Sequence, residues 1–209
     1  MQLIDSVFLI IVIMFSAIIH EVMHGVAADR LGDPTARYAG RLTLNPIPHL
    51  DPFGSILLPL MLSLSGSPIF FGWAKPVPYN PYNLQANPRW GEAIVAIAGP
   101  LSNFALALIA ALVIRANILP LEIAGAVFLV VVVNVMLGIF NLIPIPPLDG
   151  SKVLSALLPQ GIRRGYDDWR AKLEFNPFLG FGLIVIFILL AGSAFGSLVY
   201  SIARAIAGI

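Results

Sequence analysis

Cysteine is absent from this chain of 209 residues, and charged side chains are scarce. The lack of cysteine excludes disulfides, thiolate metal ligands and a cysteine nucleophile. Charged residues make up 11% of the chain and the formal net charge is +1, so no nucleic-acid partner is expected. Hydrophobic residues, in contrast, make up 58%. This balance is typical of a polytopic membrane protein rather than of a soluble domain with an anchor.

Four long apolar stretches are expected to cross a bilayer as helices, because each reaches the length of about 20 residues that a spanning helix needs. They are residues 6–28, 93–114, 123–143 and 177–203. A fifth apolar stretch, residues 53–73, is interrupted by glycine and proline, so we expect a re-entrant or broken segment there. Weak alternation within residues 38–45 leaves a short β element and a loop as alternatives. The predicted fold class is an all-α polytopic membrane protein, with one domain over residues 1–209.

The first of these stretches holds only three ionisable residues, His20, Glu21 and His24. Ionisable groups inside a membrane are costly, so their presence points to function. His20 and His24 are one helical turn apart, which lets both imidazoles reach one metal ion, and Glu21 lies beside any metal-bound water. H-E-x-x-H on a helix is the known motif of zinc metalloproteases. The alternative, two structural histidines satisfied by hydrogen bonds, is disfavoured by the cost of burying them in hydrocarbon.

A second motif, NLIPIPPLDG at residues 141–150, follows the third predicted span. Two histidines leave a catalytic zinc one protein ligand short, and a carboxylate is an accepted third ligand. Asp149 is therefore a candidate. The alternative is that Asp149 only caps the helix that follows, because Asp-Gly is a common turn pair.

HEVMH in an apolar span, followed downstream by NLIPIPPLDG, resembles the site-2 protease family of intramembrane zinc metalloproteases. GPLSN at residues 99–103, in the span between the two, is similar to a third and weaker family motif. NPIPHLDPFGSILLP and FGWAKPVP resemble the compact subgroup that lacks PDZ and CBS modules. The resemblance implies hydrolysis of peptide bonds within or next to transmembrane segments of membrane-protein substrates, as in regulated intramembrane proteolysis.

The same resemblance implies the roles of individual residues. It gives one Zn²⁺ per chain three protein ligands, namely His20, His24 and Asp149. It makes Glu21 the catalytic acid and base. Asn103 and Asn141 fall on motif asparagines that assist substrate or oxyanion binding.

A shared zinc ion also constrains the topology. If it joins both histidines to Asp149, the first and third spans run in the same direction. Residues 93–114 then supply the one full crossing between them, so residues 53–73 enter and leave on one side.

On this topology, residues 29–88 and 151–176 share one face and carry most of the lysine and arginine. The positive-inside rule makes that face cytoplasmic. We therefore expect a multi-pass protein of the cell (plasma or inner) membrane, with both termini outside and the site open towards the cytoplasmic side. Its expected partners are a transmembrane substrate and the lipid bilayer.

Two rival functions use the same residues: a zinc-binding membrane transporter, and an inactive protease homologue acting as a membrane chaperone. A transporter commonly shows internal repeats, and none is evident here. An inactive homologue is expected to have lost Glu21, which is present. Proteolysis is therefore favoured.

Other polar and small residues carry weaker expectations. His49 and Asp51 are too few for a second metal site and are expected to hydrogen bond near residues 53–88, the expected channel wall or gate over the site. Asn134 is expected to bond to a neighbouring helix. Gly192-x-x-x-Gly196 suits either a homodimer or packing inside the chain, and we favour the latter.

Overall fold

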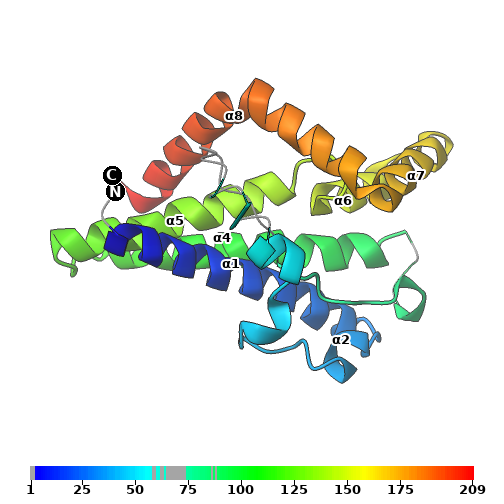
Figure 1. Cartoon of the computed structure of the whole chain (residues 1–209), viewed down its shortest axis with the longest axis horizontal. Helices are drawn as coiled ribbons and strands as arrows, with labels where there is room; N and C mark the ends of the chain where they lie inside the picture. Colours follow the sequence, from blue (N-terminus) through cyan, green and yellow to red (C-terminus); the bar gives the residue numbers. More distant parts are fainter. Residues whose placement is uncertain (1–2, 58–59, 62–63, 65–73, 86, 88) are drawn as a thin grey trace.

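The computed structural model describes residues 3–57, 60–61, 64, 74–85, 87 and 89–209. The helices are α1 (Leu3–Arg30), α2 (Thr35–Tyr38), α4 (Gly91–Arg115), α5 (Leu121–Asn141), α6 (Asp149–Leu157), α7 (Gln160–Phe175) and α8 (Pro177–Ala207) (Figure 1). Short helical turns lie at η1 (Ile47–His49), η2 (Pro52–Leu57) and η3 (Pro81–Asn83). No strand occurs among these residues, which confirms the all-α class.

Among the described residues, four helices are long and apolar enough to cross a membrane, which confirms the four predicted spans. Their apolar parts are Val7–Arg30, Gly91–Arg115, Ile123–Asn141 and Phe178–Ala207. The ends follow local chemistry. Beyond α1 the chain turns at Gly32, with φ of 98°, and α8 is closed by Gly208 in the left-handed conformation. Both φ values suit glycine because it lacks a Cβ.

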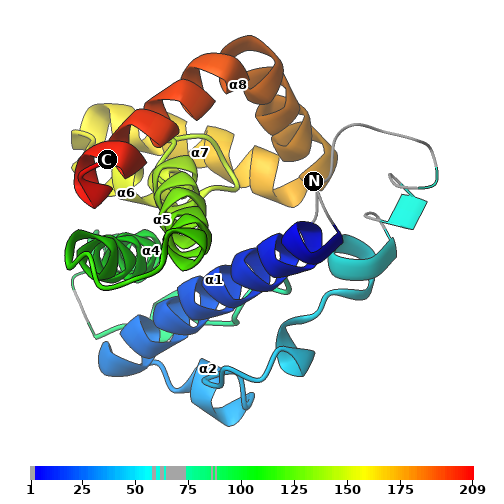
Figure 2. The same cartoon turned by 90° about the vertical axis from the view of Figure 1, so that its left-hand side faces the viewer.

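α1 and α5 run in the same direction, and α4 runs against both (Figure 1). α5 lies between α1 and α8 (Figure 2), and the chain ends lie at the same end of the bundle. The buried core joins α4, α5 and α8 through small side chains, which let the helices approach closely. Its residues are Ala107, Ala111, Val131, Val135, Val199, Ala203 and Ala207. α8 bends near its middle, so its two halves reach different parts of the molecule (Figure 1).

α6 and α7 lie at the end of the bundle where α1 and α5 finish (Figure 1). Arg89 ties α6 to the start of α4, because its guanidinium donates to the carbonyl oxygens of Ala156 and Leu158 at 2.7 and 3.1 Å. An ion pair between Arg170 of α7 and Glu92 of α4 spans 3.3 Å. These contacts hold the end of α6, together with α7, against the start of α4.

Two weaker expectations fall between α1 and α4. Tyr38 ends α2, and residues 39–45 form turns and coil rather than a β element: Gly40 has φ of 66° and the Asn45 side chain accepts from the Ile47 N–H. A left-handed residue and a side-chain turn both break extended pairing. Within 53–73, the described residues are helical up to Leu57 and at residues 60–61 and 64. The expected re-entrant path otherwise lies outside the described residues.

Candidate metal centre

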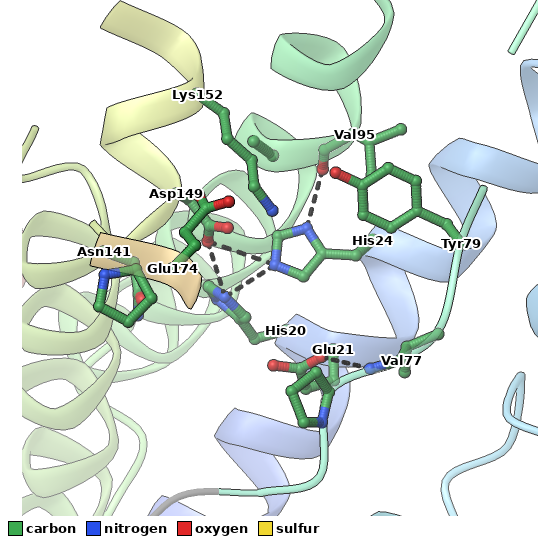
Figure 3. Close-up of a pocket in the computed structure, with 13 residues that line it drawn as sticks. His20, Glu21, His24, Val77, Tyr79, Val95, Asn141, Asp149, Lys152 and Glu174 are labelled. Carbon is green, nitrogen blue, oxygen red and sulfur yellow. Dashed lines mark hydrogen bonds and ion pairs between the residues drawn. The ribbon is translucent and has the colours of Figure 1, made fainter. Parts of the chain in front are cut away.

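Three side-chain atoms from two distant parts of the sequence converge on one point (Figure 3). His20 Nε2 lies 3.0 Å from His24 Nε2, and Asp149 Oδ2 lies 3.1 and 3.2 Å from these two nitrogens. All three residues are buried. The histidines are one turn apart on α1, and Asp149 is the first residue of α6, 129 positions beyond His20.

The hydrogen bonds on the far side of each imidazole set its tautomer. His24 Nδ1 donates to the Val95 carbonyl oxygen at 2.8 Å. His20 Nδ1 donates to Asn103 Oδ1 at 2.7 Å, because the amide nitrogen of Asn103 donates elsewhere. In neutral imidazoles both Nε2 atoms therefore present lone pairs to the Asp149 carboxylate.

This donor set fits a metal cation. Three lone-pair atoms that face one another without a proton between them are stabilised by a positive ion. Zinc bonds of about 2.0–2.1 Å in a tetrahedron put neighbouring ligand atoms about 3.3 Å apart, close to the distances here. A metal binds the ionised form of a carboxylate, so Asp149 would serve as a ligand in its charged form.

Two glycines leave room for the convergence. A Cβ on Gly99 of α4 would lie 2.6 Å from the Nε2 atoms of both histidines. A Cβ on Gly150 would collide with the carbonyl oxygen of Leu142. Because Gly150 has no side chain, α6 can start directly against the turn after α5. The glycines of GPLSN and of the Asp-Gly pair thus position α4 and α6 around the imidazoles.

Glu21 lies beside the three converging atoms and is not one of them. One of its carboxylate oxygens lies within 4.8 Å of a nitrogen of each imidazole. Its Oε2 accepts a hydrogen bond from the Val77 N–H at 2.9 Å. Asp149 contacts both Nε2 atoms directly, so it fits the role of third metal ligand better than Glu21 does. Glu21 is instead placed to interact with a group bound next to the metal.

A pocket of about 290 Å³ opens beside these groups. Besides the two histidines, Glu21 and Asp149, its lining includes Tyr79, Asn141, Lys152 and Glu174. The pocket brings together α1, the loop before α4, the end of α5, and α6 and α7.

The two motif asparagines have different surroundings. Asn141 lines the pocket, and its amide nitrogen donates to the Leu137 carbonyl oxygen at 3.0 Å. Asn103 is fully buried behind His20 rather than in the pocket. Its amide nitrogen donates to Asn134 Oδ1 at 2.9 Å and to the Ser16 carbonyl oxygen at 3.3 Å. Since both hydrogens are in use, Asn103 is placed to orient His20 and not to contact a substrate, which differs from the expectation.

Asn134 extends this buried hydrogen-bond chain to α5, in line with the expected bond to a neighbouring helix. Its amide nitrogen donates to Ser16 Oγ at 2.9 Å, so polar groups of α1, α4 and α5 meet behind His20. His49 Nε2 donates to the Thr43 carbonyl oxygen at 2.8 Å, and Asp51 accepts from N–H groups at the start of η2. His49 and Asp51 both lie outside the pocket lining.

Several residues around the pocket escaped the sequence analysis. Tyr79 carries no motif of its own, and Val95 acts through its backbone, which no side-chain pattern reveals. Lys152 had a usable signal: it follows Asp149 by three positions, which puts both on one face of a helix.

The profile of peptidase family M50 matches residues 8–126 and 116–173 of this chain. The chain belongs to peptidase family M50. This membership confirms the resemblance to the site-2 protease family that the two motifs predicted.

Curated relatives of this M50 peptidase match over much of its length. YwhC of Bacillus subtilis (strain 168), provisionally named a zinc metalloprotease, is 37% identical over 92% of this chain and 83% of its own. Rip2 of Mycolicibacterium smegmatis, named in the same provisional way, is 30% identical over 85% of this chain and 64% of its own. The zinc metalloprotease MJ0392 of Methanocaldococcus jannaschii is 38% identical over 34% of this chain and 21% of its own. No solved structure matches the M50 peptidase.

Proposed function

We propose that this zinc metallopeptidase is an intramembrane protease that hydrolyses peptide bonds within or next to transmembrane segments of membrane proteins. The observation that carries the proposal is the convergence of His20 Nε2, His24 Nε2 and Asp149 Oδ2 inside a bundle of spanning helices. The zinc metalloprotease names of the relatives support it. The pocket lining comes from parts of the chain between His20 and Glu174, and α8 packs against α4 and α5, so residues 1–209 are proposed to form one protease domain.

In this proposal His20, His24 and Asp149 hold the zinc ion. When bound, zinc lowers the pKa of a coordinated water to about 7 and polarises the carbonyl of the scissile peptide. Asn103 keeps the Nδ1 proton of His20 facing away from the metal, and the Val95 carbonyl does the same for His24.

Glu21 is the proposed general base and acid. The Val77 N–H holds Oε2 at 2.9 Å, which orients the carboxylate and leaves Oε1 to take a proton from the attacking water. Glu21 then returns this proton to the leaving amine as the C–N bond breaks. Asn141, on the pocket wall, is proposed to bind the substrate backbone through its amide.

The depth of the motif supports cleavage inside the membrane. His20 and His24 lie ten and six residues before the end of α1, which is roughly 15 and 9 Å along the helix axis. By the positive-inside rule this end of the bundle, with α6 and α7, is proposed to face the cytoplasm across the cell (plasma or inner) membrane. A helical substrate hides its backbone, so we propose that it unwinds locally before attack.

The test measures bound zinc and proteolysis in detergent-purified protein. We expect about one tightly bound zinc per chain in the wild type, and markedly weaker binding after Asp149→Ala. We expect Glu21→Gln to retain zinc, lose cleavage of a reconstituted transmembrane substrate and trap that substrate uncleaved. Zinc uptake into sealed vesicles without any cleavage would favour the transporter alternative. Zinc binding with neither cleavage nor transport would favour the chaperone-like alternative.

A further inference from the structure

Lys152 brings a positive charge into the pocket that the proposed mechanism has not used. It lies on α6, one turn after Asp149, and lines the same pocket as Glu21 and both histidines. In Figure 3 its ammonium group points towards His24 and Asp149. In that view the imidazoles lie between the Lys152 ammonium and the Glu21 carboxylate.

Tyr79 holds this ammonium from the opposite wall. Lys152 Nζ lies 5.4 Å from the centroid of the Tyr79 ring, and the two side chains hydrogen bond. Burial alone would lower the pKa of Lys152, but the negative charge of Asp149 and the hydrogen bond with Tyr79 outweigh it, so that pKa is raised. The side chain is therefore a cation at neutral pH.

Within the described part of the chain, no ion pair of 4.0 Å or less involves Lys152. Its side chain is half-buried, and a cation partly removed from bulk water without a paired carboxylate is costly. A cationic side chain in such a position is typical of a functional site, where negative charge forms next to it during the reaction.

Peptide hydrolysis develops negative charge that needs a donor in this pocket. Attack of the water oxygen forms a C–O bond and pushes the carbonyl electron pair onto the peptide oxygen. Asn103 cannot reach that oxygen, because its amide hydrogens are bonded behind His20. Asn141 already donates to Leu137 through one of its two amide hydrogens. Lys152 has three N–H donors, of which Tyr79 takes one at most.

We propose that Lys152 is a further catalytic residue, which donates a hydrogen bond to the oxygen of the scissile carbonyl and stabilises its negative charge in the transition state. Glu21 receives the proton of the water on one side of the metal-binding residues, and Lys152 faces the developing oxyanion on the other. Lys152 keeps its proton throughout. When the C=O bond re-forms, the C–N bond breaks and the amine leaves with the proton carried by Glu21. Tyr79 is the positioning residue. This inference rests on the proteolytic function proposed above.

The test compares Lys152→Met with the wild type and with Lys172→Met. Methionine keeps the length of the side chain and removes its charge, and Lys172 is an exposed lysine of α7 outside the pocket lining. We expect Lys152→Met to retain about one zinc per chain and to lower kcat by about 10²–10³-fold with little change in KM. Lys152→Arg should recover part of kcat, and Tyr79→Phe should lose less than Lys152→Met. Lys172→Met should match the wild type.

A second readout uses an uncleavable phosphinic peptide, whose anionic oxygens imitate the transition state. Its affinity should fall with kcat in Lys152→Met, whereas the affinity of the uncleaved substrate should not. An unchanged kcat, an unchanged affinity for the phosphinic peptide, or loss of zinc together with activity would each overturn the assignment of Lys152. A wild type that binds zinc without cleaving would instead overturn the proteolytic function, and this inference with it.

Discussion

Gly99 contributes to the metal centre by lacking a side chain. Its Cα faces both imidazoles so closely that a methyl group would lie 2.6 Å from each Nε2 atom and 2.5 Å from His24 Cε1. These distances are shorter than any normal non-bonded separation, so the histidines or α4 would have to move. Neither side can yield cheaply, because each imidazole is fixed by its Nδ1 hydrogen bond.

Gly99→Ala is therefore expected to abolish tight zinc binding, with cleavage reduced by at least about 100-fold. The measurement is the metal content of purified protein after dialysis. Gly125→Ala is the matched control, because a Cβ at this position of α5 meets nothing within 4 Å. Equal zinc content in the two variants would contradict the crowding argument.

Asn103 is expected to act through His20. Asn103→Leu removes the acceptor of the His20 Nδ1 proton and should weaken zinc binding by about 10–100-fold. Competition with a chelator of known affinity measures this change. Zinc binding as tight as in the wild type would show that helix packing alone fixes the imidazole.

At the scale of residues the sequence predicted which side chains are candidate ligands, and it was silent about the orientation of Asn103. HEVMH specified His20, Glu21 and His24 because helical spacing alone puts the two imidazoles on one face. Nothing in GPLSN tells whether the amide of Asn103 faces the pocket or the bundle interior. That depends on Ser16 and Asn134, which come from two other helices.

The segment of residues 74–85 is mostly irregular, with one helical turn at η3, and it is held in place by specific hydrogen bonds. Its Val77 N–H orients Glu21, and its Tyr79 faces Lys152. Asp33, fully buried after α1, anchors it: Oδ2 accepts from the Asn80 N–H at 2.6 Å and Oδ1 accepts from Asn83 Nδ2 at 2.9 Å. Asp33 thus positions the segment that brings Val77 and Tyr79 to the pocket, although Asp33 itself does not line the pocket.

Asp33→Asn is expected to lower the free energy of unfolding by about 1–3 kcal/mol near pH 7, because it removes charged hydrogen bonds. Burial alone would raise the pKa of Asp33, but bonds from Thr35, Asn83 and Asn80 outweigh it and lower that pKa. The stability that Asp33 contributes is therefore present above its unfolded pKa of about 4 and is lost as pH falls through its lower folded pKa.

Thermal unfolding of both proteins in detergent, from pH 7 down to pH 3, checks this expectation. The difference in Tm between wild type and Asp33→Asn should shrink below about pH 4. A difference that stays constant down to pH 3 would mean that the Asp33 charge contributes nothing.

Elements differed in how well the sequence predicted them. The spanning helices followed from composition, since an uninterrupted apolar run of this length has few other stable conformations in a membrane. Residues 38–45 were ambiguous because eight residues with weak alternation contain too little information, and a strand also needs a neighbour to pair with. For residues 151–176 the sequence analysis used only their lysine and arginine content. The structure adds that they form two helices and that the first carries Asp149 and Lys152.

The arrangement of the whole molecule predicts which loops share a side of the membrane. α1 and α5 run in parallel, as the shared metal required, so the turn between α4 and α5 lies opposite to α6 and α7 (Figure 1). This relation followed from joining the two motifs through one ion. The sidedness itself came from charge, which the helix packing does not encode.

The absence of cysteine makes this topology directly testable. Ala116→Cys lies in the exposed turn after α4, and Gln160→Cys lies at the exposed start of α7. In intact cells, a membrane-impermeant maleimide should label Ala116→Cys and should label Gln160→Cys only after permeabilisation. The unmodified chain is the blank. Labelling of both positions in intact cells would contradict the parallel arrangement, and a reversed pattern would contradict only the sidedness.

The separation of 129 positions between His20 and Asp149 also sets the order in which the proposed zinc ligands are synthesised. During synthesis α1 is made first, and α6 follows only after α4 and α5 have been made. With the ligand set proposed here, the nascent chain holds two imidazoles but no third ligand until most of it has left the ribosome. The order of synthesis therefore delays completion of the proposed zinc site until α1, α4 and α5 have all been made.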